Sequence, residues 1–200
     1  DREQLSLPLE LLPFYRSGFR RLLSLSGQPG RRQPEQEASP RDQLGMWRRR
    51  LSSLTPPYSV VLTYWELVLD LSDKKHAEST GRSDLFSSML RNLAWNQEEY
   101  VFWPLSLPMQ HDLVADTSLF WEAVTTLRPS YVLLFGPKTC RCLFPEKEFD
   151  YTHFDSEGIQ FLQLPDPDAM LPDNRKAKNF VWQRLRTLPI SLASQENHQS

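Results

Sequence analysis

The chain has 200 residues, of which 40% are hydrophobic and 12% aromatic, and this is enough to build the core of one globular domain. It contains no run of 18 or more apolar residues, and its first residues are charged, so we expect neither a membrane span nor a signal peptide. The net charge of -2 is unevenly spread, because residues 1–50 carry ten Lys or Arg against six Asp or Glu.

The first predicted element is an amphipathic helix over residues 13–25, followed by a linker over residues 27–41 that is rich in Gly, Pro, Gln and charge. A second short helix is predicted over residues 43–54. We group residues 1–57 as an N-terminal arm that contacts either a protein partner or phosphates; a solvated helix face is the alternative. Its candidate contact residues are Phe14, Arg16, Phe19, Arg20, Arg48, Arg49 and Arg50.

Residues 58–190 show apolar blocks alternating with helical patterns. The blocks predict four strands, over residues 59–64, 99–105, 131–135 and 159–164. The helices are expected over residues 83–93, 118–127, 138–143 and 174–188, with Ser83 or Asp84 capping the first, while residues 67–82 are polar. This alternation predicts a three-layer α/β/α fold with a central, mostly parallel, four-stranded sheet. Residues 191–200 are expected to be a disordered tail.

The only cysteines, Cys140 and Cys142, are too closely spaced for a disulfide on a helix, so a reducing, cytoplasmic location is expected. They lack the partners of a metal site, and we expect no metal and no cofactor. His153 lies among aromatic residues and is expected to be a hydrogen-bonded loop residue.

Three segments resemble the uracil-DNA glycosylase superfamily, most closely its iron-sulfur branch. They are GRSDLFSSML at residues 81–90, LRPSYVLLFG at 127–136, and LPDPDAML at 164–171, the last followed by Lys178 and Trp182. Their order and spacing match a helix start, a central strand and the loop before the last helix in that family. The resemblance implies the family's fold over most of residues 58–188.

The resemblance also implies that the chemistry has been lost. The family has a glycine-rich motif with a water-orienting acidic or amide residue after the first strand, where this chain has Tyr64, Trp65 and Glu66. Its histidine, which stabilises the departing base, falls on Asp166, and its serine falls on Asp168. Glu66 and Asp166 are weak catalytic candidates. Glu66 also fits a surface or cap residue, and Asp166 a solvated turn. The cluster-binding cysteines are missing too.

We therefore expect a non-catalytic interaction module, an accessory subunit of a DNA replication or repair assembly, that binds protein partners and not membranes. One alternative is a glycosylase with an altered site and a cleft lined by Tyr64, Trp65, Trp103 and Asp166. Another is a nucleic-acid-binding protein without chemistry, which would lose binding steeply with salt. The candidate binding residues are Tyr64, Trp65, Gly81, Arg82, Trp103, Asp166 and Asp168.

Overall fold

The computed structural model describes residues 40–93, 95–109 and 112–190. The expected helix over residues 13–25, most of the linker, and the expected tail over residues 191–200 lie outside the described residues. So do the arm positions Phe14, Arg16, Phe19 and Arg20. Among the described helices, none is long and apolar enough to cross a membrane.

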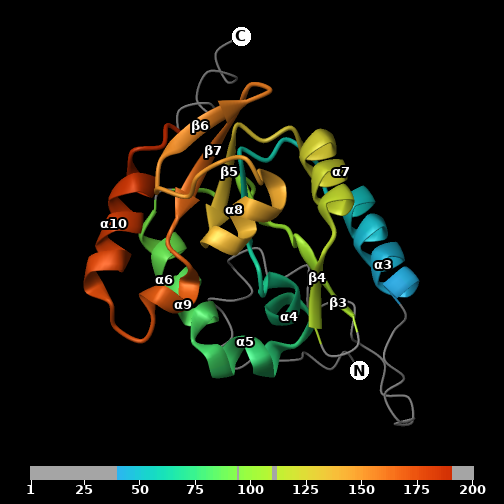
Figure 1. The fold of residues 1–200 in the computed structure, drawn as a ribbon, viewed down its shortest axis with the longest axis horizontal. Coiled ribbons are helices and arrows are strands. Elements are labelled where there is room, and N and C mark those ends of the chain that lie inside the picture. Colours follow the sequence, from blue (N-terminus) through green and yellow to red (C-terminus); the bar gives the residue numbers. More distant parts are fainter. Residues whose placement is uncertain (1–39, 94, 110–111, 191–200) are drawn as a thin grey trace, which may run out of the picture.

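The centre of the fold is a five-stranded sheet (Figure 1). Its order is β2-β1-β5-β7-β6, with β1, β2, β5 and β7 parallel and β6 antiparallel to β7. The expected α/β class and mostly parallel sheet are confirmed. The strands are β1 (Val60–Tyr64), β2 (Tyr100–Phe102), β5 (Tyr131–Phe135), β6 (His153–Ser156) and β7 (Ile159–Leu164).

The prediction of four strands was wrong, because it missed β6. This strand lies at the edge of the sheet and is half-buried on one side only, so its sequence HFDS has no apolar block. A tight turn joins β6 to β7 through Glu157 and Gly158, whose φ angles of 55° and 79° are both positive. Two positive φ values suit the turn that connects adjacent antiparallel strands.

Helices cover both faces of the sheet (Figure 1). Alternation along β5 shows why: Val132 and Leu134 enter one buried cluster, and Leu133 and Phe135 enter the other. The first cluster also holds residues of α3 (Pro40–Ser53), α7 (Thr117–Leu127) and α8 (Pro137–Leu143). The second holds residues of α6 (Arg82–Asn92), α9 (Pro167–Met170) and α10 (Arg175–Arg186).

Helix α3, which the sequence analysis placed in the arm, packs with the sheet. Trp47 and Leu51 share a buried cluster with Val61 of β1. As a result Arg50 is only 9% exposed, and the Arg48 Nε lies 3.0 Å from a carboxylate oxygen of Glu122 on α7. The sequence pattern suggested that Arg48–Arg50 form one exposed basic surface. In the structure they do not, because Arg50 is buried and Arg48 pairs with Glu122.

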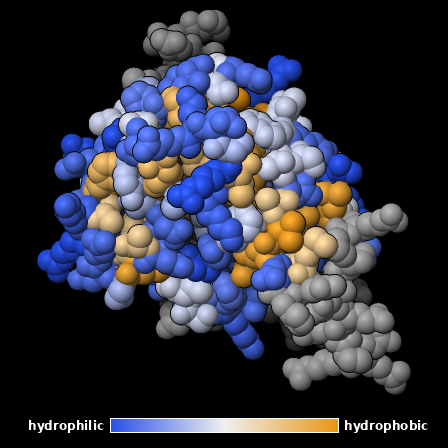
Figure 2. Space-filling view, in the orientation of Figure 1, coloured by the Kyte–Doolittle hydropathy of each residue, from blue (hydrophilic) through white to orange (hydrophobic). Residues whose placement is uncertain are grey.

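A separate hairpin follows β2. It consists of β3 (Ser106–Met109) and β4 (Asp112–Ala115), which pair antiparallel. Neither strand was predicted, because both are short and β3 contains Pro108. Met109 and Val114 of this hairpin are exposed, and Figure 2 shows apolar side chains gathered on this part of the surface.

Two short helices, α4 (Leu67–Ser72) and α5 (Lys74–Thr80), occupy the stretch that looked polar. The expected cap of α6 was also wrong. Its N-cap is Gly81, which has a left-handed φ of 73° and ends α5 as well, whereas Ser83 is buried inside the helix. The left-handed conformation of Gly81 thus allows the tight junction between α5 and α6.

Candidate functional site

The candidate site lies at the carboxyl edge of the central strands. β1 runs into Trp65 and Glu66, β5 into Gly136, and β7 into Asp166, and these three strands are parallel neighbours. β1 pairs with β2 on one side and with β5 on the other, so the strand order reverses here. Such a reversal is where open α/β sheets place their ligands.

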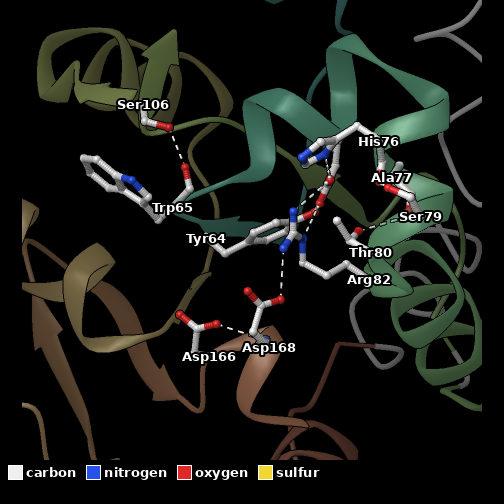
Figure 3. A network of polar contacts seen from close by, with 11 residues as sticks. Tyr64, Trp65, His76, Ala77, Ser79, Thr80, Arg82, Ser106, Asp166 and Asp168 are labelled. Carbon is white, nitrogen blue, oxygen red and sulfur yellow. Dashed lines mark hydrogen bonds and ion pairs between the residues drawn. The ribbon is translucent and has the colours of Figure 1, made fainter. Parts of the chain in front are cut away.

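Asp70 of α4 is the centre of a buried polar network that includes Tyr64, His76 and Arg82, which Figure 3 shows close together. The Arg82 Nε and Nη2 donate to its two carboxylate oxygens at 2.7 and 3.1 Å. The Tyr64 hydroxyl donates to it at 2.7 Å, and the His76 Nδ1 lies 2.8 Å from it. Because the Asp70 and Arg82 side chains are only 2% and 5% exposed, this pair is shielded from water.

Arg82 also connects the network to α9, since its Nη1 donates to the Asp168 carboxylate at 2.9 Å. Burial lowers the pKa of Arg82, but the hydrogen bonds to Asp70 and Asp168 outweigh it and raise the pKa above its usual value. Burial and the Asp70 charge together hold the pKa of Tyr64 well above 10. Arg82 and Tyr64 were predicted as binding residues, and here they bind other side chains.

Asp166 begins α9, and its Oδ1 accepts a hydrogen bond from the Asp168 backbone N–H at 2.9 Å. The Asp166 side chain is half-buried, more than a solvated turn suggests, and Asp168 is exposed. Burial raises the pKa of Asp166, and the Asp168 charge adds to the rise. The reason for this burial is its contact with the end of β5.

That contact is with Gly136. A Cβ atom at residue 136 would lie 2.5 Å from the Asp166 Oδ2, and the φ angle of 87° is one that side chains disfavour. The positive φ angle favours glycine at this position, and an added Cβ atom would also force the Asp166 carboxylate to shift. The Asp166 carboxylate thus packs against the end of β5.

Glu66 lies at the start of α4 as its N-cap residue, without a capping hydrogen bond from its side chain. It is half-buried, and this burial raises its pKa, to which the nearby charge of Asp166 contributes. Its position agrees with the cap interpretation. The two weak catalytic candidates, Glu66 and Asp166, are thus brought close enough to influence each other.

The expected cleft of Tyr64, Trp65, Trp103 and Asp166 does not form. Tyr64 stacks on Phe86 in the cluster on one face of the sheet, whereas Trp103 is fully buried in the cluster on the other face. Trp103 packs edge-on against Trp47, with ring centroids 5.6 Å apart. Trp103 is therefore part of the core, and its ring is not accessible to a nucleobase.

Trp65 is nearly buried and points away from Arg82 (Figure 3). The Lys138 ammonium lies 3.7 Å from the centroid of its ring. The Trp65 carbonyl accepts a hydrogen bond from the Ser106 hydroxyl at 2.5 Å, which ties the end of β1 to β3. Lys138 is exposed and was not predicted, because a lone lysine gives no sequence signal.

Neither a protein-family model nor a curated protein matches this sequence. Across residues 40–93, 95–109 and 112–190, no three or more His, Cys, Asp or Glu side chains are placed to hold a metal ion. Asp70 and His76 were missed in the sequence because they make their contacts within the polar-looking stretch before Arg82.

Proposed function

We propose that this chain is a non-catalytic interaction module with a uracil-DNA glycosylase-like fold, serving as an accessory subunit of a DNA replication or repair assembly. Support comes from the resemblance in residues 81–90, 127–136 and 164–171 together with the chemistry of the carboxyl edge. Asp166 is the observation that carries the proposal. It stands where the resemblance implies a histidine.

The Asp166 carboxylate has the wrong charge for base release. A glycosylase stabilises the negative charge that develops on the departing base, and a carboxylate at that place repels it. Glu66 adds a second acidic group close by, since the charge of Asp166 helps to raise the pKa of Glu66. Arg82, the cation whose charge acts on both carboxyl groups, is already engaged by Asp70 and Asp168. The electrostatics of this edge therefore oppose the family's reaction.

Steric filling supports the same proposal. A flipped base needs a pocket bounded by backbone that approaches closely. Here the end of β1 carries the bulky Tyr64 and Trp65, and the Asp166 carboxylate packs against Gly136. The polar groups of the network satisfy one another instead of facing an empty site.

One observation favours the alternative of a glycosylase with an altered site. Burial raises the pKa of both Glu66 and Asp166. A carboxyl group that retains its proton can donate it to a leaving base, as raised-pKa acids do in glycoside hydrolysis. This alternative requires activity that increases as the pH falls toward the raised pKa values.

The test is base release from a uracil-containing single-stranded oligonucleotide by the full chain between pH 4 and 8, with an active uracil-DNA glycosylase as the positive control. Glu66→Gln and Asp166→Asn variants keep the side-chain volumes. We expect no release above the protein-free background at any pH. Release that both substitutions abolish would overturn the proposal and establish the altered site. Oligonucleotide binding measured at rising salt identifies a nucleic-acid-binding protein by its steep loss of affinity.

A further inference from the structure

A groove lies beside the β3–β4 hairpin. The apolar side chains that line it are Trp65, Leu69, Pro108, Leu113 and Val114, and its volume is about 620 Å³. We call it the hairpin groove. Val114 is 46% exposed and the neighbouring Met109 is 42% exposed, which is high for side chains of this kind. Figure 2 shows apolar side chains gathered on this part of the surface.

The groove adjoins the place where the N-terminal chain enters the fold. α3 begins at Pro40 and packs against β3, one strand of the hairpin. Met46 of α3 is a further exposed hydrophobic residue, at 38%. Of the four large hydrophobic side chains exposed among the described residues, three therefore lie on α3, β3 or β4, and the fourth is Tyr151. Two of them, Met109 and Val114, lie on the hairpin itself, and apolar side chains gathered on a surface in this way mark a contact site.

Residues 13–25 have the composition to cover this surface. The segment reads PFYRSGFRRLLSL, with apolar residues at helical spacing, three arginines and no acidic residue. Asp112 lines the groove as well. The Lys138 ammonium, which also lines it, lies over the Trp65 ring. The segment therefore offers apolar side chains to the floor and arginines to Asp112.

The chain is also long enough. Residues 26–39 separate the segment from α3, and a flexible chain of this length has a root-mean-square span of about 20 Å and an extended limit of about 45 Å. Because α3 itself packs on β3, the groove is near the point from which this connection starts.

We propose that residues 13–25 dock in the hairpin groove of the same chain, with Phe19 on its floor. This inference goes beyond the proposed function and does not depend on the loss of chemistry. It adds regulation: the arm contacts its own domain, and a protein partner that binds the arm must first displace it. The groove is then covered while the arm is docked and exposed once the arm is displaced.

Hydrogen exchange of the full chain tests this proposal. Phe19→Asp removes an arm anchor, and Val114→Asp, at an exposed position, introduces a charge into the groove. We expect Phe19→Asp to speed exchange of the β4 amides about tenfold or more, and Val114→Asp to speed exchange within residues 13–25 similarly. In the double variant, the β4 amides and residues 13–25 should exchange as fast as they do in the single variants. Tyr151→Asp, at a comparably exposed position outside the hairpin, is the control and should change neither region.

Exchange that Phe19→Asp and Val114→Asp leave unchanged would overturn the proposal. Thermal melting of each variant verifies that the domain remains folded, and Phe19→Ser provides a milder arm variant. Light scattering at two protein concentrations distinguishes an arm that docks on its own domain from an arm that docks on a second copy of the chain. A monomer with concentration-independent protection supports docking within one chain. A dimer whose protection rises with concentration would contradict it and assign the groove to a second copy. Uracil release would overturn the proposed function alone.

Discussion

The Asp166 carboxylate lies so close to Gly136 that a single added methyl group at residue 136 would stand 2.5 Å from its Oδ2. This contact joins the carboxyl ends of two neighbouring parallel strands, β5 and β7. It also holds a negative group where the resemblance implies a positive or neutral one. The strand packing and the proposed loss of chemistry thus involve the same pair of residues.

Gly136→Ala should therefore destabilise the protein by about 2–4 kcal/mol, since it adds a steric clash to a backbone conformation that disfavours side chains. Gly158→Ala is the matched control, because its φ of 79° is also positive but nothing lies within 4 Å of the added methyl group. We expect the control to lose only about 1 kcal/mol. Urea unfolding measures both values, and equal losses would contradict the contact with Asp166.

Asp70→Ala should destabilise the protein by about 3–5 kcal/mol, because it leaves the Arg82 guanidinium buried without its main partner. Asp168→Ala removes the third hydrogen bond of the same guanidinium, but the Asp168 side chain is 60% exposed. Its loss should be below about 1 kcal/mol. Chemical denaturation of both variants checks this order, and a larger effect at Asp168 would show that the network depends on α9.

Asp166→Asn should stabilise the protein at neutral pH. Burial raises the pKa of Asp166 in the folded state above its ordinary 3.8, so the folded protein binds this proton more tightly than the unfolded chain does. The charged carboxylate therefore destabilises the fold above the raised pKa, and this effect disappears as the pH falls through the raised pKa and below 3.8. The Asn oxygen still caps α9. Thermal melts from pH 7 down to pH 3 should show the advantage shrinking; an advantage that grows on acidification would contradict the assigned direction.

The thiols should react slowly. Burial raises the pKa of both Cys140 and Cys142, which reduces the thiolate fraction at neutral pH. Cys140 is fully buried, and we expect it to be alkylated only on unfolding, whereas the half-buried Cys142 should react faster as the pH rises. Mass spectrometry after iodoacetamide treatment at pH 7 and 9 measures both sites. Rapid labelling of Cys140 in the folded protein at pH 7 would contradict its burial.

The parallel core strands were predictable because their residues are apolar on both faces. β5 and β7 were located to the residue, and β1 within one residue, from blocks such as YVLLF. β6 was not predictable, because an edge strand buried on one side alternates polar and apolar residues over only four positions. The helices α4 and α5 were missed for a similar reason: each has fewer than eight residues, too few to establish a helical period.

The site was only partly predictable. Tyr64, Trp65 and Asp166 were singled out in the sequence because the resemblance implies other residues at these positions. The partners Asp70 and His76 were not, since nothing in a helix sequence reveals which side chain its arginine will meet. Trp103 was misplaced because a sequence does not show to which face of the sheet the chain turns after β2. Its burial against Trp47 depends on α3.

The most direct test of the central claim is whether the carboxyl edge accepts a base at all. Free uracil is titrated into the full, isotope-labelled chain while the backbone amide of Gly136 and the indole N–H of Trp65 are followed by NMR. We predict no saturable shift at either group, in the natural chain or in the Asp166→Asn variant, because the Tyr64 and Trp65 side chains are buried and the Asp166 carboxylate packs against Gly136. A saturable uracil-dependent shift at Gly136 and Trp65 would contradict the account and show that a base site survives.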